Sequence, residues 1–536
     1  MATYTRTSAW NNGGTFNNPV LLWYAKGVGV LQSRKLNDTS SWWFFAAIHG
    51  HEFRSGRPTY WGSLPSPPTV PITPVPSDSD IKLYWDQCQH QSWYFLPWHR
   101  GYLLALEAQV RKAIEPLGGP SDWALPYWNY FGPGNQYQIP PAFAEKTLPD
   151  GSPNPLYVEA RYGPDFDHNA YIPTPVGIKQ HPGDPNFVNG PVLEDCLSDK
   201  NFIGDSGTPP KGFGGPQTRF SHGGGSFGDL ELNPHGLVHV YVGSGSKPPK
   251  PRQGLMSDPD TAGLDPIFYL HHANIDRMWA VWNITEKNAN PPDKAWLNGP
   301  VAPGRFQFVM PLPGGKSWIY TPSQMSDLNQ QDYTYDDLSG PPKPVNALAQ
   351  RLMRLGVAKE EAASAAEKET PMITGEKIEL AGASPTAIKL ETRGARTRVQ
   401  LDSMVRNKVS ASLRDAAETK KPDHVFLELE NVRGNRDAYV LSVYVNLPPE
   451  ASPGEHPELL AGSAPLFGLR TASEPDGEHA GQGLNFVMDI SKIVDDLHLQ
   501  NALDTNSLNI SIVPQRPIQD EADITVGRVN IYRKGD

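Results

Sequence analysis

Residues 265–279 of the chain read DPIFYLHHANIDRMW, a segment whose apolar side chains recur with the period of an α-helix. The spacing predicts a helix over Ile267 to Trp282 that carries two adjacent histidines, His271 and His272. Adjacent side chains on a helix point about 100° apart, so one imidazole can bind a metal while the other faces a cavity or a hydrogen-bond partner. An unmet buried polar group costs about 1–3 kcal/mol, and metal binding removes that cost. The segment therefore points to a metal site on a buried helix.

Two more predicted helices carry histidines. Apolar residues at helical spacing predict one helix over Trp98 to Glu115, directly after Pro97, and another over His235 to Val242. His235 and His239 are four residues apart, so both imidazoles leave the same helix face and can bind one ion. Such a pair is often incidental, and no glutamate follows His235 directly as a zinc protease would require.

A second group of histidines lies nearer the N-terminus. His90 precedes Pro97 and His99 follows it, so a loop ligand and a helix ligand can converge on one ion. Either His49 or His51 can supply the third imidazole. The chain has too few cysteines for structural zinc sites, and imidazoles without carboxylates suit copper or zinc better than magnesium, calcium or manganese.

The composition excludes several classes of protein. The formal net charge of -11 argues against a nucleic-acid partner, and 38% hydrophobic residues in a chain of 536 are ample for packed cores. The 54 prolines and 49 glycines have no repeating period and indicate long ordered loops. No apolar run approaches the roughly 18 residues of a membrane span. Two cysteines cannot form a disulfide framework and the first residues lack the blocks of a signal peptide, so we expect a cytoplasmic protein with no membrane partner.

Composition and periodicity divide the chain into three regions. Residues 1–342, rich in Trp, Gly, Pro and His, are predicted to form a mainly α-helical domain with long loops. Residues 343–385 are expected to be a linker, although Asn346 to Lys368 has a helical pattern. Residues 386–536 switch to a period of two and are predicted to form an antiparallel β-sandwich. The strands expected there are Phe426–Glu430, Ser442–Asn446, Leu508–Ile512 and Thr525–Ile531.

Several segments together resemble the type 3 copper family of tyrosinases, catechol oxidases and hemocyanins, over most of residues 40–340. The similar segments are Ile48-His49-Gly50, Cys88 to Arg100, Leu125 to Trp128, Glu231 to Gly243 and Asp265 to Trp279. The resemblance implies a catalytic domain whose four-helix bundle holds two copper ions, with O2 as co-substrate. It also implies that one copper is bound by His49, His90 and His99 and the other by His235, His239 and His272. His51 and His271 are then non-ligands, and His271 lines the substrate cavity.

The resemblance assigns roles to residues around the histidines. Cys88 stands two residues before His90, as in family members with a thioether bond between the cysteine and that histidine ring. Glu231, four residues before His235, resembles a carboxylate that holds a water near the copper. Such a water can take the proton of a phenol, whose free pKa is near 10.

Other positions compare with the family less directly. Gly236 stands where enzymes that hydroxylate monophenols well often have asparagine, and it is expected to leave an open cavity mouth. Phe268 resembles a buried ring packed among the ligands, and Asp276 with Arg277 resembles a structural ion pair. Met256 is a candidate for the residue that borders the substrate cavity.

Three functions compete on this resemblance. The first is o-hydroxylation of monophenols together with oxidation of o-diphenols to o-quinones. The second is a catechol oxidase that acts on o-diphenols only, which Gly236 favours, and the third is oxygen binding of the hemocyanin kind. Residues 386–536 resemble the C-terminal domain of plant polyphenol oxidases and are expected to act as a lid over the copper cavity. Small phenols are the expected partners, and the sequence leaves the oligomeric state open, a homo-oligomer included.

Overall fold

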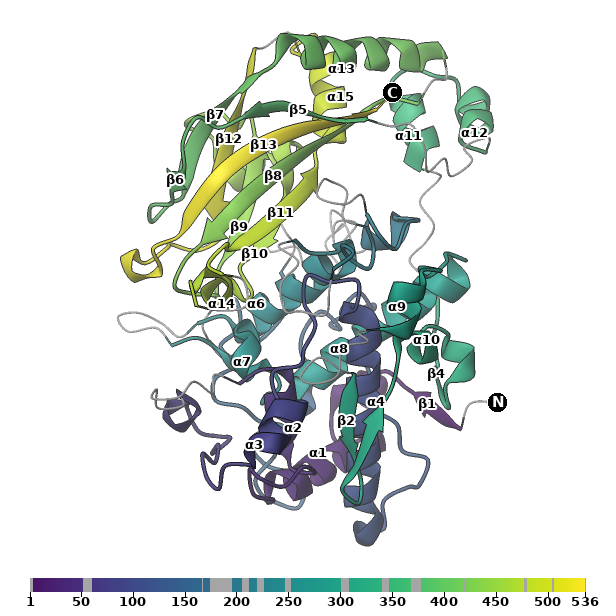
Figure 1. Ribbon diagram of the computed structural model, residues 1–536, viewed down its shortest axis with the longest axis vertical. Helices are drawn as coiled ribbons and strands as arrows, with labels where there is room; N and C mark the ends of the chain where they lie inside the picture. Colours follow the sequence, from purple (N-terminus) through teal and green to yellow (C-terminus); the bar gives the residue numbers. More distant parts are fainter. Residues whose placement is uncertain are drawn as a thin grey trace.

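The computed structural model describes residues 3–51, 60–165, 167–173, 195–204, 212–218, 226–245, 252–299, 308–339, 347–367, 377–418, 421–476, 480–503 and 506–535. They form a helical part followed along the chain by a part built on a large β-sheet, and each part has a buried apolar core. Figure 1 shows the sheet lying at one end of the helices. None of the helices in these ranges combines the length and the apolar character that crossing a membrane requires.

The helical part contains the helices that the sequence predicts around the histidines. α4 (Phe95–Ile114) begins before the predicted Trp98, with Pro97 in its first turn, where a missing N–H is tolerated. α6 (Leu237–Gly243) follows a π-helical turn at Glu231–Gly236, and α8 (Ile267–Ala280) continues into a second such turn. Among the described residues, the further α-helices of this part are α1 (Pro19–Gln32), α2 (Trp42–His49), α3 (Asp78–Tyr84), α7 (Pro259–Ala262), α9 (Lys294–Asn298) and α10 (Pro322–Met325). Two strand pairs flank them, β1 (Tyr4–Arg6) with β4 (Tyr333–Tyr335) and β2 (Val309–Leu312) with β3 (Lys316–Ile319).

α8 is buried along its whole length, so its charged residues need partners inside the protein. The carboxylate of Asp276 accepts hydrogen bonds from four side chains, those of Arg6, Arg100, Tyr333 and Tyr335. Arg277 instead donates to the side chain and main chain of Asp337. The expected pairing of Asp276 with Arg277 is therefore wrong, because neighbouring side chains on a helix diverge and each meets a different element.

The C-terminal part is built on one nine-stranded sheet. The strand order is β10, β9, β12, β7, β5, β13, β8 and β11, with β6 paired to β13, and each neighbouring pair is antiparallel. The period of two correctly predicts antiparallel strands, and hydrogen bonds join them into one sheet. The sandwich arrangement stays a prediction. The bounds are β5 (Lys377–Ala383), β6 (Ile388–Lys389), β7 (Ala395–Leu401), β8 (His424–Arg433), β9 (Val440–Val445), β10 (Leu460–Pro465), β11 (Leu484–Asp489), β12 (Ser507–Pro514) and β13 (Thr525–Gly535).

Helices accompany the sheet. α13 (Ser403–Asp415) and α15 (Ser491–Leu499) pack on it, and α14 (Leu469–Ser473) follows β10 at the junction with the helical part (Figure 1). α11 (Ala347–Arg354) and α12 (Lys359–Glu367) lie within the predicted linker, and their apolar residues join the core of the sheet part. β5 also begins inside that range, while residues 341–346 and 368–376 lie outside the described residues.

Candidate metal centre

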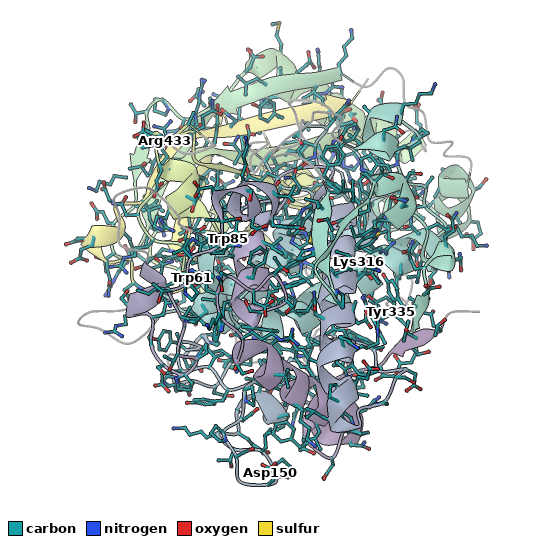
Figure 2. The ribbon with its side chains drawn as sticks, turned by 60° about the horizontal axis from the view of Figure 1, so that its bottom comes forward. Trp61, Trp85, Asp150, Lys316, Tyr335 and Arg433 are labelled. Carbon is teal, nitrogen blue, oxygen red and sulfur yellow. The ribbon has the colours of Figure 1, made fainter. Side chains whose placement is uncertain are left out.

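The first histidine cluster joins two helices and the loop between them. His49 ends α2, His99 lies in the first turns of α4, and Cys88 and His90 come from the loop before α4. All four side chains are buried, and their nitrogen or sulfur atoms lie within 4.8 Å of one another. Sequence spacing left His49 and His51 as alternatives. The structure brings His49 into the cluster, whereas the centroid of the His51 ring lies 4.3 Å from that of Trp61 and 4.7 Å from that of Trp85. Figure 2 labels these two tryptophans.

The second cluster is formed by α6, the turn before it and α8. It contains His235, His239, His271 and His272, again buried and with ring nitrogens within 4.8 Å of one another. Burial holds the pKa of each of these imidazoles well below its usual value, and neighbouring imidazoles lower it further. The rings are therefore neutral, which is the form that binds a metal ion.

The two clusters face each other across a short gap. The ring centroids of His99 and His272 are 4.3 Å apart and nearly parallel, and those of His90 and His235 are 5.8 Å apart. Phe268 packs between the clusters, 4.7 Å from His49 and 4.2 Å from His272, as expected for the buried ring. The arrangement suits two metal ions side by side in a buried site.

Main-chain carbonyl oxygens orient four of the imidazoles. The Nδ1 atoms of these rings lie 2.7–3.0 Å from carbonyls, in the pairs His49 with Pro259, His99 with Phe95, His235 with Glu231 and His239 with Met256. A hydrogen bond at Nδ1 leaves Nε2 as the free lone pair. Among the described residues, Nε2 of His235 has no hydrogen-bond partner although it is fully buried. An orphaned, inward-facing nitrogen of this kind fits a metal ligand.

Cys88 lies against the rings of the first cluster. Its Sγ atom is 3.5 and 3.7 Å from the two ring nitrogens of His90 and 3.3 Å from Nε2 of His99. Burial raises the pKa of the thiol well above its usual range. The second cysteine, Cys196, is buried elsewhere in the helical core.

Glu231 is buried beside the loop that carries His90, and it does not lie at the surface. Both of its carboxylate oxygens accept the main-chain N–H of Gln91, at 2.8 and 2.9 Å, and the side chain is buried. Burial raises the pKa of this carboxyl well above its usual value, although the N–H groups of Gln91 and Gly228 lower it in part. Glu231 is therefore a carboxyl group with unusual affinity for a proton, next to the first cluster.

The C-terminal part covers the second cluster with one aromatic ring. Phe467, between β10 and α14, stacks on His239 with ring centroids 4.1 Å apart and planes inclined by 23°. The same ring lies 5.7 Å from both His90 and His235. Sequence reasoning missed Phe467, since nothing local distinguishes a phenylalanine after a strand from a core residue of its own domain.

Gly236 does not leave an open cavity mouth. A Cβ atom at this glycine would lie 2.9 Å from Cγ of Pro465, so the C-terminal part closes directly over it. The expectation was wrong because it considered the helical part alone. Met256 is fully buried and contributes its carbonyl oxygen to His239.

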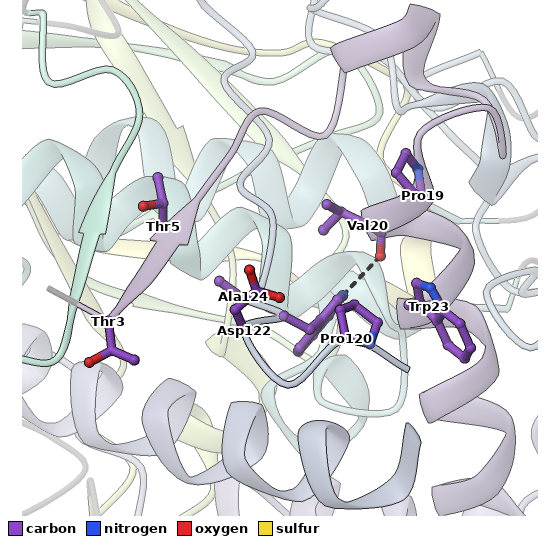
Figure 3. A pocket seen from close by; sticks show the side chains of 9 residues that line it. Thr3, Thr5, Pro19, Val20, Trp23, Pro120, Asp122 and Ala124 are labelled. Atoms are coloured by element: carbon purple, nitrogen blue, oxygen red, sulfur yellow. Dashed lines mark hydrogen bonds between the residues drawn. The ribbon is translucent and has the colours of Figure 1, made fainter. Parts of the chain in front are cut away.

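A cavity of about 300 Å³ lies elsewhere, where the N-terminal strand meets α1. Figure 3 shows its lining, which includes Thr3, Val20, Trp23 and Asp122. None of the clustered histidines contributes to it, so it is separate from the metal centre.

Comparisons with known proteins identify relatives of both parts. The family model for the common central domain of tyrosinase matches residues 39–285, and a domain of unknown function matches residues 377–534. A tyrosinase from Hahella sp. (strain CCB-MM4) is 30% identical over 528 residues, covering 96% of this chain and 97% of that protein. A chloroplastic polyphenol oxidase from Vitis vinifera is 30% identical over 282 residues, covering 52% of this chain and 42% of its own. The structure of latent apple tyrosinase aligns with a TM-score of 0.57 at 19% identity, covering 99% of this chain and 97% of that one.

Proposed function

Because the chain belongs to the type 3 copper family of tyrosinases and polyphenol oxidases, and is thus a copper-dependent oxidase of phenols, we propose that it acts on both monophenols and o-diphenols. Its cofactor is a pair of copper ions, for which the structure offers two histidine clusters, and its co-substrate is O2. The observation that carries the proposal is a buried carboxyl, Glu231, beside the paired clusters. A monophenol must lose its proton before its ring is attacked, and this group can receive it, directly or through a water that it holds.

We assign the ligands as one set of three imidazoles to each copper. His49, His90 and His99 hold the first ion, and His235, His239 and His272 hold the second. These rings come from α2, α4, α6 and α8 and the segments beside them, which we propose as the four-helix bundle of the catalytic domain. His271 completes the second cluster geometrically, but its ring stacks parallel to His235 and, in this assignment, borders the substrate.

A copper pair held by these imidazoles would supply O2 binding and the transfer of electrons from the phenol to O2. The protein supplies the geometry and the environment. Neutral imidazoles give the ions no compensating charge. The main-chain carbonyls at Nδ1 fix the orientation of the rings. In this proposal Phe268, packed between the clusters, keeps water out of the gap. We further propose that Cys88 forms a thioether bond with the ring of His90, which would fix the loop ligand in place.

The substrate ring occupies the position that Phe467 now fills. The Phe467 ring stacked on His239, with centroids 4.1 Å apart, supports this placement because it is a flat ring of the size of a phenol. In this proposal the C-terminal domain, residues 386–536, is a lid whose Phe467 must leave before a phenol enters. The cytoplasmic location and the boundaries of the three regions stay predictions.

Changing Glu231 to Gln tests the proton acceptor. The amide keeps an oxygen that can accept the N–H of Gln91 but has no carboxylate to take a proton. We expect monophenol hydroxylation to fall by about 100-fold or more, the usual contribution of general base catalysis, and o-diphenol oxidation to change little. Initial rates of O2 uptake on each substrate measure this. Equal losses on both substrates would show that Glu231 only supports His90.

The proposed function and its alternatives are distinguished by oxygen uptake of the copper-loaded protein carrying Phe467→Ala, which opens the site. We expect quinone from tyrosine and from its diphenol counterpart. Quinone from the diphenol alone would make the enzyme a catechol oxidase, the outcome that Gly236 favours. Reversible O2 binding without turnover of either substrate would support oxygen carriage of the hemocyanin kind and contradict both.

A further inference from the structure

One short segment of the catalytic domain supports a histidine in each cluster. It runs from Met256 to Asp260, before and into α7. The Met256 carbonyl lies 2.7 Å from Nδ1 of His239, and the Pro259 carbonyl lies 2.9 Å from Nδ1 of His49. Because each contact fixes a ring orientation, the shape of this segment bears on both copper sites.

An arginine of the C-terminal domain binds the same segment. Arg470, in α14, donates from Nη2 to the carboxylate of Asp260 at 2.8 Å and to that of Asp258 at 3.4 Å. These carboxylates flank Pro259, whose carbonyl meets His49. Asp258 also caps α7, because its side chain accepts the N–H of Asp260 at 3.0 Å. The arginine therefore binds both carboxylates of one compact turn.

Arg470 is itself held from its own domain. Its main-chain N–H donates to Asp437 at 2.7 Å, and Nη1 donates to Glu474 at 3.1 Å. Asp437 also accepts from Gln253 of the catalytic domain at 2.9 Å. Burial and the nearby Asp258 raise the pKa of Asp437 to about 7, which reflects the crowding of acidic groups here.

We propose that Arg470 is a positioning residue for the copper centre: by clamping Asp258 and Asp260, it holds the Pro259 carbonyl in place to orient His49. The inference rests on the proposed ligand set. It gives the C-terminal domain two opposite effects within four residues, since Phe467 obstructs the substrate position while Arg470 supports a ligand. If a substrate is to enter a working site, Phe467 must then move away from the histidines while Arg470 keeps its contacts with Asp258 and Asp260.

Copper retention of the full chain tests the clamp. Copper-loaded wild type and Arg470→Ala are dialysed against a chelator, and copper per chain is followed with electron paramagnetic resonance. We expect the variant to lose one ion at least about tenfold faster, as for other residues that orient a ligand from outside. The ion left alone then gives a resonance signal that a coupled pair does not. Arg470→Lys, which presents one ammonium instead of a fork, should retain copper to an intermediate degree.

Two further variants separate positioning from docking. Asp260→Asn removes the arginine's nearest carboxylate in the catalytic domain and should speed loss of the same ion, even if Arg470→Ala folds poorly. Arg516→Ala removes another arginine at the junction, which donates to Ser244 at 2.7 Å, and it should retain both ions.

The outcomes are distinct. Loss of copper from Arg470→Ala and Asp260→Asn at the wild-type rate, or equal loss from Arg516→Ala, would overturn the clamp alone. A wild-type chain that does not bind two copper ions would overturn the ligand assignment and the clamp together.

Discussion

Replacing His235 with Ala is expected to leave about one copper ion per chain and to abolish turnover of an o-diphenol, a loss of roughly three orders of magnitude or more. The Nε2 atom of His235 is buried with no hydrogen-bond partner among the described residues, and in the proposed ligand set a copper ion is its partner. Since both ions must act together on one O2, loss of one ion removes the reaction rather than halving it. Copper per chain and the initial rate of O2 uptake measure the two effects.

His271 provides the matched control. It lies in the same cluster, equally buried, with both ring nitrogens unpartnered among the described residues, so geometry alone does not distinguish it from a ligand. The proposed assignment makes it a non-ligand, and His271→Gln should therefore retain two copper ions even if substrate binding weakens. One copper ion in His271→Gln and two in His235→Ala would reverse the assignment.

The second large effect is expected from Phe467→Ala. Its ring stacks on His239 and lies within 5.7 Å of His90 and His235, which is the space that a substrate ring needs. Its removal should raise turnover of a bulky o-diphenol by the intact, copper-loaded chain by about tenfold or more, corresponding to about 1.4 kcal/mol or more of lost obstruction. Phe467→Leu, which keeps most of the bulk, should stay close to wild type.

Stability must be followed in the same experiment. Truncation of a buried phenylalanine costs about 3–5 kcal/mol in a core, so thermal unfolding would show whether the C-terminal domain remains docked. Equal turnover by Phe467→Ala and wild type, with both chains folded, would mean that this ring does not restrict access.

The sequence was most informative where one element carries its own signal. α4 and α8 were predicted because their apolar residues recur at helical spacing, and β8 and β13 because theirs alternate. The helices within 347–367 were treated as a linker because their composition is polar. Their burial depends on the sheet, which no local pattern reveals.

The metal centre was predictable only in part for a similar reason. The pair His235 and His239 follows from helical spacing, whereas the choice of His49 over His51 needed a family resemblance, because both precede an irregular segment. Phe467 and Arg470 belong to the C-terminal domain. Phe467 contacts the histidines directly, whereas Arg470 contacts the segment that supports them. Their roles depend on how two domains meet, and neither periodicity nor motif spacing contains that information.

The contact between Gly236 and Pro465 has a consequence for how such sequences diverge. A side chain at position 236 meets the proline ring of the other domain, so a substitution there is tolerated only if position 465 becomes smaller or the domains separate. The two positions should therefore change together among relatives that have this C-terminal domain, and independently among relatives that lack it. Glycine beside His235 would then indicate that a second domain packs over this position, and any effect on substrate preference would be secondary.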